Sequence, residues 1–254
     1  MSKTKISCII PTCNRKELLK ITLNSVLNQS LAPDEIFIMN NGDDIIDFAY
    51  LDLATENKFN IKIVNLPTIT RLAELLNFGS SLASSEYLAF LEDDDLWEKD
   101  YIKKLSENIT PDFKVYVTRC DRLKNGIISK YKNANGKLNL KNLFTYNPGV
   151  NISNMCINKK ALFSIKGFDT KLLVGIDKSL IIDFILNNYK IKVLDEIQKI
   201  GRYHEGVRLS SNYKNVINSQ KAFYQKYKNH MSLMQRVRII YSVLYLKIFQ
   251  KVKK

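Results

Sequence analysis

The alternation of short apolar runs with helical patterns in the first 91 residues constrains the fold most strongly. Residues 5–10 and 35–39 are apolar enough for buried strands, and the leucines within residues 16–29 recur at helical spacing. The same succession of strand, helix and strand follows at residues 61–66, 71–84 and 87–91. Strands joined by helices pair in parallel, so the sequence predicts a Rossmann-like, doubly wound α/β fold with a mostly parallel sheet. Ligands bind at the carboxyl edge of such sheets.

The rest of the chain predicts a second half of the same domain and a helical end. Further elements are expected at 98–108 (helix), 114–118 (strand), 152–158 (apolar stretch), 177–188 (helix) and 191–194 (strand). Residues 119–150 are polar and lose clear periodicity. We therefore expect two halves of one domain, residues 1–118 and 119–212, that share one continuous sheet. Residues 213–254 are expected to form basic amphipathic helices.

The charge of the chain is concentrated at its carboxyl end. The formal net charge is +14, and Glu205 is the last acidic residue. Eleven lysines and arginines follow it, which leaves a charge of only +3 for residues 1–205. A basic segment of this kind is typical of a protein that meets an anionic surface, either nucleic acid or a membrane leaflet. Because the segment contains no recognisable nucleic-acid module, we expect no nucleic-acid partner.

Neither the cysteines nor the apolar segments indicate secretion or a membrane span. The four cysteines, at positions 8, 13, 120 and 156, form no CxxC pair and no metal-ligand spacing, which predicts reduced, buried thiols. The apolar run Ile6–Ile10 ends at Pro11 and is too short for a signal peptide. No apolar stretch reaches the length of about 18 residues that a membrane-spanning helix needs. These features predict a cytoplasmic protein.

Four consecutive acids at residues 92–95 follow directly after the expected strand 87–91 and therefore lie at the ligand-binding edge. Adjacent carboxylates repel one another unless a cation joins them. Mg²⁺ and Mn²⁺ prefer such hard oxygen ligands and complete their coordination with phosphate oxygens and water. The run predicts a metal site that binds a phosphorylated substrate. The alternative is a solvated acidic turn that caps the helix expected near residue 97.

Polar residues also follow the first two expected strands, at the same edge of the sheet. Thr12, Asn14 and Arg15 come after the first strand, and Asn41 lies in a polar turn after the second. A guanidinium such as that of Arg15 can bind a diphosphate as a charged fork, and the amide of Asn41 can read a nucleotide base. The alternative for Asn41 is ordinary turn chemistry, with Gly42 supplying a positive φ.

Three segments in this order and spacing resemble the donor half of family 2 glycosyltransferases: IIPTCNR at 9–15, EIFIMNNGDD at 35–44 and YLAFLEDDDLW at 87–97. The resemblance continues through Asn77-Phe78-Gly79, Gly167-Phe168-Asp169, Asp177 and Arg202-Tyr203-His204. It covers about residues 1–212. It implies a GT-A fold, in which 1–118 bind a nucleotide-activated sugar and 119–212 bind the acceptor. It also implies transfer with inversion of the anomeric centre.

The resemblance assigns roles to the motif residues. Asp94 matches the ligand for Mg²⁺ or Mn²⁺, and Glu92 matches a position, usually Asp, that contacts the ribose or the donor sugar. Asn41 stands where many relatives have an Asp that accepts the uracil N3 proton. An amide carbonyl accepts that bond from uracil and thymine alike, so a UDP- or dTDP-sugar is expected. The remaining donor-binding residues are expected to be Pro11, Thr12, Asn14, Arg15, Arg71 and Asp93.

Two further residues have a role that the resemblance implies and a structural alternative. Asp177 matches the catalytic base, and a positioned carboxylate that takes the proton of an attacking sugar hydroxyl accelerates transfer by roughly 10² to 10⁴. Its alternative role is the N-cap of a helix over residues 178–188. His204 lies in a segment that resembles the loop closing over the diphosphate, where some relatives use a histidine as a metal ligand. Its alternative is a surface histidine.

The last segment, residues 232–254, combines an apolar stripe with flanking cations. The stripe consists of Leu233, Val237, Ile240, Tyr241, Leu244 and Ile248. Basic residues near an anionic leaflet contribute on the order of 1 kcal/mol each, and such a helix can lie in the headgroup region. We expect it to hold the protein on the cytoplasmic face of the inner membrane. The alternative is packing of the stripe on the domain or on a second subunit, which leaves a homo-oligomer open.

Together these features predict an inverting, metal-dependent glycosyltransferase that acts on a hydroxyl of a bacterial surface glycan or a lipid-linked oligosaccharide. One alternative is a nucleotidyltransferase of sugar-nucleotide synthesis, but residues 11–15 lack the Gly-rich loop that would cradle a triphosphate. The other alternative is a non-catalytic basic protein that docks on membranes through residues 206–254. That function would leave the acidic residues 92–95 without a purpose.

Overall fold

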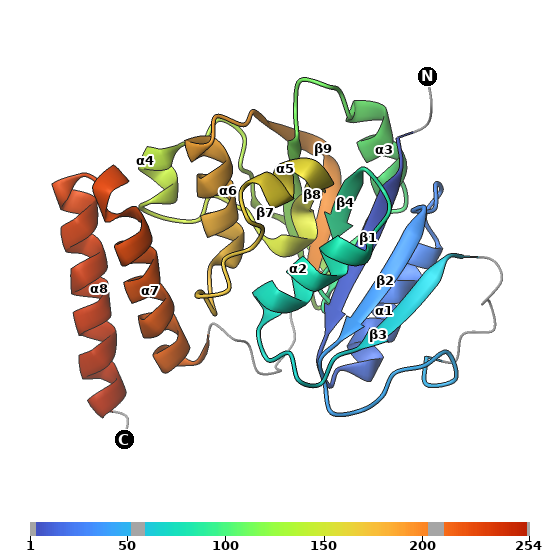
Figure 1. Cartoon of the computed structure of the whole chain (residues 1–254), viewed down its shortest axis with the longest axis horizontal. Helices are drawn as coiled ribbons and strands as arrows, with labels where there is room; N and C mark the ends of the chain where they lie inside the picture. Colours follow the sequence, from blue (N-terminus) through green and yellow to red (C-terminus); the bar gives the residue numbers. More distant parts are fainter. Residues whose placement is uncertain (1–3, 52–58, 203–210, 253–254) are drawn as a thin grey trace.

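The computed structural model describes residues 4–51, 59–202 and 211–252. Nine strands in these ranges form one sheet in the order β3-β2-β1-β4-β8-β6-β9-β5, and β7 pairs with β6 outside this order (Figure 1). The strands are β1 (Ile6–Thr12), β2 (Glu35–Asn40), β3 (Ile61–Asn65), β4 (Tyr87–Phe90), β5 (Asp95–Trp97), β6 (Val115–Lys124), β7 (Ile127–Lys132), β8 (Met155–Asn158) and β9 (Ile191–Arg202). The helices are α1 (Lys16–Leu27), α2 (Leu72–Leu82), α3 (Tyr101–Asn108), α4 (Leu140–Leu143), α5 (Lys159–Ser164), α6 (Ile176–Leu186), α7 (Tyr213–Tyr227) and α8 (Leu233–Val252), with short 3-10 turns η1 (Ile152–Asn154) and η3 (Lys228–His230).

The first four strands form the parallel sheet that the sequence predicts. β3 pairs with β2, β2 with β1 and β1 with β4, all in parallel. The register sets Thr12 opposite Asn40 and Asn40 opposite Asn65, so the carboxyl ends of these three strands are level. The doubly wound α/β fold is therefore confirmed, and its polar strand ends lie at one edge of the sheet.

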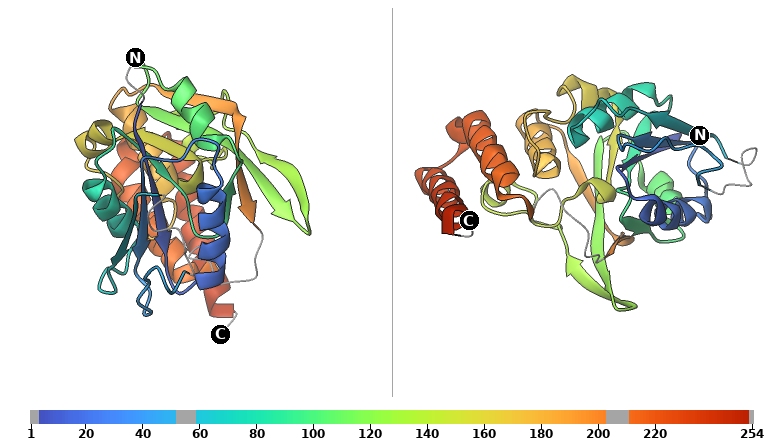
Figure 2. Two further views of the ribbon diagram at one scale, coloured as in Figure 1. Left: turned by 90° about the vertical axis from the view of Figure 1, so that its right-hand side faces the viewer. Right: turned by 90° about the horizontal axis from the view of Figure 1, so that it is seen from below.

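The second half of the sheet is mixed. β8 is antiparallel to both β4 and β6, whereas β6 and β9 are parallel. β6 runs through the expected boundary after residue 118, and the polar stretch 119–150 contains the rest of β6, all of β7 and α4. Figure 2 shows the β6–β7 hairpin projecting from the body of the protein. Every residue of β7 is exposed, so this strand carries no apolar alternation in its sequence.

Two other elements differ from the expectation. Residues 95–97 form β5, which pairs antiparallel with β9, and α3 begins only at Tyr101. The acidic run therefore leads into a strand, and the alternative of a turn that caps a helix near residue 97 is wrong. β9 extends to Arg202, well beyond the expected residues 191–194, because it pairs with β6 along its length and with β5 near its end.

The sheet separates two hydrophobic cores. Ile9 of β1 belongs to a core with α2, α5 and α6, whereas Cys8 and Ile10 belong to the opposite core with α1 and α3. Successive side chains of a strand point to opposite faces, which explains this division. Leu19 and Leu23 of α1 fill the second core, as their helical spacing predicts. Because helices cover both faces, β1 is buried along its whole length.

The cysteines agree with the expectation at three positions of four. Cys8, Cys120 and Cys156 are buried, and all four thiols are free. Cys13 is exposed, because it follows β1 in the loop at the carboxyl edge of the sheet. The prediction of a buried thiol is therefore wrong at Cys13.

Two basic helices close the chain, as predicted, and they lie side by side at one end of the molecule (Figure 1). α7 is tied to α6, because Lys226 forms ion pairs of 2.8 Å with both Asp169 and Asp183, and the Tyr227 hydroxyl donates to Asp183. α8 packs on α7 and buries part of Ile239 against the first core. Among the described helices, none has the length and apolar character that crossing a membrane requires.

Candidate functional site

The acidic run lies at the carboxyl edge of the sheet, immediately after β4, and two of its four carboxylates are buried. Asp93 accepts hydrogen bonds from the Thr12 hydroxyl at 2.8 Å and from Arg15 at 3.1 Å. Asp95 forms an ion pair of 2.6 Å with Lys199 and accepts a bond from the Ser153 hydroxyl. Only 6% of the Asp93 side chain and 8% of the Asp95 side chain are exposed. Both carboxylates are therefore neutralised within the protein.

The backbone of the acidic run is fixed by side chains from distant segments. The Thr22 hydroxyl of α1 bonds to the carbonyl oxygens of Asp93 and Asp95 at 2.7 and 2.9 Å. Arg202, at the end of β9, donates to the carbonyl oxygens of Asp93 and Asp94 at 2.9 and 3.1 Å. The same guanidinium also bonds to Leu18 of α1 at 2.9 Å. These bonds hold the run rigidly, which a preorganised ligand site requires.

The other two carboxylates of the run are less enclosed. Asp94 has 21% of its side chain exposed, and its Oδ2 lies 3.5 Å from the Arg15 guanidinium. The carboxylate of Glu92 accepts no hydrogen bond from the described residues, although its main-chain N–H donates to Ser153. Burial, followed by the charges of Asp94 and Asp95, raises the pKa of Glu92 well above its ordinary value. Glu92 and Asp94 are therefore the less buried acids of the run.

A paired loop forms the wall of the site beside β1 and β2. The Asn14 side chain bonds to both the carboxylate and the main-chain N–H of Asp43, at 2.9 and 2.8 Å. Asn14, and not Gly42, has the positive φ, at 53°. A Cβ atom at Gly42 would lie 2.2 Å from Asn14 Oδ1, so glycine is required there by this close approach. The expectation of a positive φ at Gly42 is therefore wrong.

Asn41 lies in the same wall, and the Nδ2 group of its side-chain amide already has a hydrogen-bond partner. Its Nδ2 donates to the Ile69 carbonyl oxygen at 2.9 Å, and its main-chain N–H donates to Thr12 at 3.1 Å. Its Oδ1 accepts no hydrogen bond from the described part of the chain. The amide therefore presents an acceptor, as the interpretation of a base-reading residue requires.

Two predicted donor residues have other surroundings. Pro11 is buried within β1, opposite Met39 of β2. Arg71 caps the start of α2, donates to the Thr170 carbonyl oxygen and lies 3.9 Å from Glu74. The structure thus brings Thr12, Arg15 and Asp93 together with Asp94, whereas Arg71 contacts the second half of the chain.

Asp177 lies at the start of α6, on the second half of the chain. Its Oδ2 accepts a bond of 3.3 Å from the Asn147 amide, and burial raises its pKa above the ordinary value. The charge of Asp177 is the smallest of those that raise the pKa of Glu92, after burial and the charges of Asp94 and Asp95. The N-cap of α6 is Gly175, so the alternative role of Asp177 as the cap is wrong.

The sequence did not single out four residues that support this site. Ser153 and Lys199 hold Asp95, Thr22 fixes the backbone, and Asn147 contacts Asp177. Only Asn147 carried a local signal, because it precedes Pro148-Gly149 in a predictable turn. His204 lies outside the described residues. Within those residues, no cluster of three or more His, Cys, Asp or Glu side chains could hold a metal on its own.

Comparison with known proteins agrees with this geometry. Residues 7–168 match the model of the family described as Glycosyl transferase family 2. In Bacillus subtilis, the uncharacterized glycosyltransferase YwdF is 32% identical over 111 residues, which cover 43% of this chain and 40% of YwdF. TuaG of the same organism, named for teichuronic acid biosynthesis, is 31% identical over 108 residues, or 41% of this chain and 42% of TuaG. The chain thus spans less than half of the length of these relatives.

A solved structure shows the same fold along nearly the whole chain. The crystal structure of S. aureus TarS 1–349 in complex with UDP-GlcNAc superposes with a TM-score of 0.69 and 20% identity. The match covers 96% of this chain and 72% of the TarS chain. The fold is therefore the predicted GT-A fold. Because the family model matches more than half of its residues, the chain belongs to glycosyl transferase family 2.

Proposed function

We propose that this protein transfers a sugar from a nucleotide diphosphate donor to a hydroxyl of a glycan or a lipid-linked oligosaccharide. The observation that carries the proposal is the position of Asp94 and Arg15 at the carboxyl edge of the first sheet half, together with the carboxylate of Asp177 at the start of α6 in the second half. One side offers charges for a diphosphate and the other offers a base for an acceptor. A nucleotidyltransferase would need a phosphate-cradling loop after β1, where Asn14 and Asp43 instead bond to each other.

The wall beside β1 and β2 fits a pyrimidine nucleotide. The unused Oδ1 of Asn41 can accept the N3 proton of uracil or thymine, because Nδ2 is already bonded to Ile69. Arg15 is 31% exposed and can bond to diphosphate oxygens while it stays paired with Asp93. The complex of TarS with UDP-GlcNAc supports a UDP-sugar as the first donor to test.

The residues present fit a metal ion that is shared with its substrate. Asp93 and Asp95 are enclosed with Arg15 and Lys199, whereas Asp94 has 21% of its side chain exposed, so we assign Asp94 as the carboxylate for the ion, with Glu92 next to it in the run. Mg²⁺ and Mn²⁺ are often bound through one or two carboxylates, with phosphate oxygens and water completing the octahedron. When bound, the ion would supply Lewis-acid stabilisation of the departing diphosphate.

Asp177 is the residue that we assign as the base. The acceptor hydroxyl must lose a proton as its oxygen bonds to the anomeric carbon and the bond to the diphosphate breaks. Asp177 Oδ2 accepts this proton, and the Asn147 amide orients the carboxylate. A displacement in one step on the face opposite the diphosphate inverts the anomeric centre.

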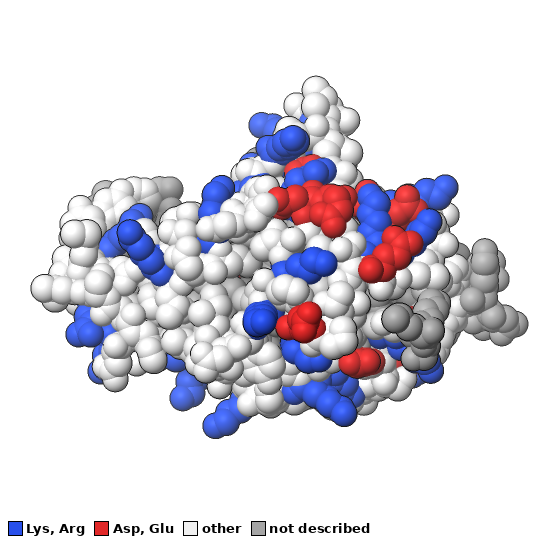
Figure 3. Space-filling model, turned by 90° about the horizontal axis from the view of Figure 1, so that it is seen from above, with Lys and Arg blue, Asp and Glu red and all other residues white. Residues whose placement is uncertain are grey.

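The exposed stripe of α8 is the surface that we assign to an anionic membrane. The exposed residues are Leu233, Met234, Val237, Ile240, Tyr241, Leu244, Tyr245 and Ile248. No acidic residue lies in 211–252, and the end of the molecule that α7 and α8 form shows cations and no acids in Figure 3. A helix with an apolar stripe, tyrosines and cations has the character of an interfacial helix. Stronger sedimentation with anionic than with neutral vesicles is expected, and equal sedimentation would contradict the assignment.

The test of the transfer function is a binding and hydrolysis screen. The purified chain is titrated with UDP-, dTDP-, GDP- and CMP-sugars, first with Mn²⁺ or Mg²⁺ and then with a chelator. We expect a metal-dependent response to a UDP- or dTDP-sugar, and Asp94→Asn should lower turnover at least about 10²-fold. Asp112→Asn is the matched control, because Asp112 is exposed and its substitution makes the same change of charge outside the site. Full activity of Asp94→Asn would refute the assignment.

A further inference from the structure

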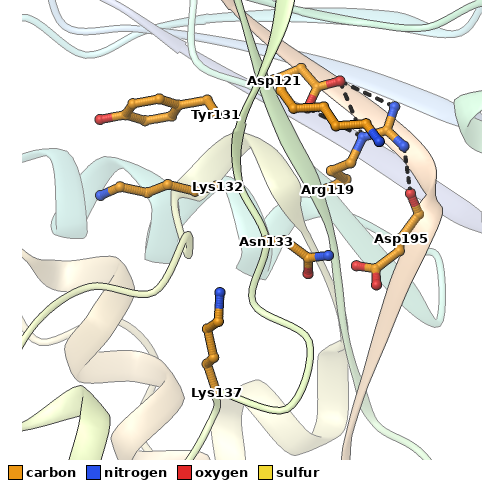
Figure 4. A pocket seen from close by; sticks show the side chains of 8 residues that line it. Arg119, Asp121, Tyr131, Lys132, Asn133, Lys137 and Asp195 are labelled. Atoms are coloured by element: carbon orange, nitrogen blue, oxygen red, sulfur yellow. Dashed lines mark hydrogen bonds and ion pairs between the residues drawn. The ribbon is translucent and has the colours of Figure 1, made fainter.

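A polar cavity of about 360 Å³ opens beside the β6–β7 hairpin, and its lining includes none of the acidic residues 92–95 (Figure 4). It is lined by Arg119, Asp121, Lys130, Tyr131, Lys132, Asn133, Lys137 and Asp195. These residues come from β6, from β7 and the loop after it, and from β9. The volume lies at the lower end of the range of roughly 300–1,000 Å³ for small-molecule sites, which admits a sugar unit.

The cavity has an excess of positive charge. Arg119 is neutralised by Asp121 at 3.1 Å and donates to the main-chain oxygen of Asp195 at 2.9 Å. Lys130, Lys132 and Lys137 have no carboxylate within ion-pair distance in the described part of the chain. Figure 3 shows cations gathered on the projecting hairpin. Three ammonium groups without a carboxylate partner around one cavity favour a ligand that carries negative charge.

The cavity also has a side that suits hydroxyl groups. Figure 4 shows Arg119, Asp121 and Asp195 together on one side, while Lys132 and Lys137 lie on the other. The Asp195 carboxylate accepts one bond, from Asn135 at 2.8 Å, and its Oδ1 has no donor among the described residues. A simple anion would be repelled by this carboxylate. A ligand that has both hydroxyl groups and a negative group could satisfy the two sides at once.

A chain of contacts connects the cavity to the proposed base. The Lys132 ammonium donates to the Asn147 carbonyl oxygen at 3.3 Å, and the Asn147 amide donates to Asp177 at 3.3 Å. A Cβ atom at Gly149 would lie 2.9 Å from Lys132 Cβ, so the hairpin packs tightly on this loop. The cavity therefore lies on the acceptor side, two contacts from the group that activates the acceptor hydroxyl.

We propose that this cavity binds an acidic unit of the acceptor glycan, one that bears a carboxylate or a phosphodiester. The unit places its negative group among the lysines that line the cavity and its hydroxyls toward Asp195, while the chain runs along residues 147–150 to Asp177. The proposal rests on the proposed transfer function, because it names the class of acceptor for the same site. It makes the protein a transferase selective for acidic glycans.

The test is calorimetric titration of the full chain, without donor or metal, at low salt. The probes are tetragalacturonate, a glycerol-phosphate tetramer and neutral maltotetraose. We expect one of the two acidic probes to bind more tightly, which identifies the anion, and the neutral probe to bind at least about tenfold more weakly. Because no donor is present, the result is independent of sugar transfer, and a failure of transfer alone would leave this binding intact.

Variants separate the cavity from overall charge. Lys130→Gln combined with Lys137→Gln should weaken acidic binding about tenfold, whereas Lys160→Gln combined with Lys190→Gln removes the same charge elsewhere and should not. Lys132 stays intact because it holds Asn147. Any one of four results would overturn the proposal. Two concern the probes: equal affinity for the neutral probe, or tighter binding of a single-stranded oligonucleotide of the same charge. The other two concern the variants: no loss of affinity in the first variant, or an equal loss in the control variant.

Discussion

Within four consecutive residues, this protein uses carboxylates in two opposite ways. Asp93 and Asp95 are almost fully enclosed and each has a cation within 3.1 Å, whereas the residues Glu92 and Asp94 are less buried. The run forms a turn between β4 and β5, in which the Asp95 N–H donates to the Glu92 carbonyl oxygen at 3.1 Å, and its side chains alternate between enclosed and less enclosed positions. The enclosed pair fixes the backbone that presents the other pair. One sequence motif therefore contains both the support of the site and its reactive groups.

The largest effect expected from this comparison is on stability. Asp95→Asn removes the partner of Lys199, which is 4% exposed, and leaves a buried ammonium without a counter-charge. Burial alone lowers the pKa of Lys199, and Asp95 outweighs it and raises that pKa. Breaking such a pair costs about 3–5 kcal/mol of the free energy of unfolding. Urea denaturation measures it, with Asp94→Asn as the control that should stay within about 1 kcal/mol of the wild type. Equal losses in both variants would abolish the distinction between the two pairs.

The next effect concerns Asp177, the reactive carboxylate of the second half. Asp177→Asn should lower kcat by roughly 10² to 10⁴ without unfolding the protein. The base must be ionised, and burial raises the pKa of Asp177, so the rate should fall with decreasing pH above the ordinary aspartate value of about 3.9. Steady-state rates across pH measure both effects. An unchanged acidic limb in the residual activity of Asp177→Asn would remove Asp177 from the role of base.

The sequence predicts the less enclosed, reactive carboxylates better than it predicts the residues that support the enclosed ones. The parallel strands β1, β2 and β4 are buried on both faces, so their apolar runs, and the acidic run after β4, are visible in the sequence. The partners of Asp95 are not visible, because Ser153 and Lys199 come from η1 and β9, which lie far along the chain. β7 escapes prediction for another reason, since all its residues are exposed. Reactive groups thus follow from local pattern, while their supports depend on tertiary contacts.

A smaller effect is expected at Asn147, which we assign as a positioning residue. Its Oδ1 accepts from the N–H groups of Gly149 and Val150, and its Nδ2 contacts Asp177. Asn147→Ala should lower kcat about tenfold and change KM less, because the base stays present but is oriented less well. In an Asp177→Asn background the same change should have little further effect, since the two residues act as a unit. Additive losses in the double variant would show that Asn147 acts independently of Asp177.

The smallest effect is a gain in stability, whereas the other substitutions lower stability or activity. The Glu92 carboxylate is partly buried, lies beside Asp94 and accepts no hydrogen bond from the described residues, so its charge opposes folding. Glu92→Gln keeps the shape and removes the charge, and should raise the free energy of unfolding by about 1 kcal/mol at neutral pH in the presence of a chelator. Urea denaturation of the two proteins measures the difference. A loss of stability would mean that Glu92 supports the fold as Asp95 does. A gain in stability with lower activity would instead group Glu92 with Asp94. A group that destabilises the fold and promotes turnover is held in place for its ligand.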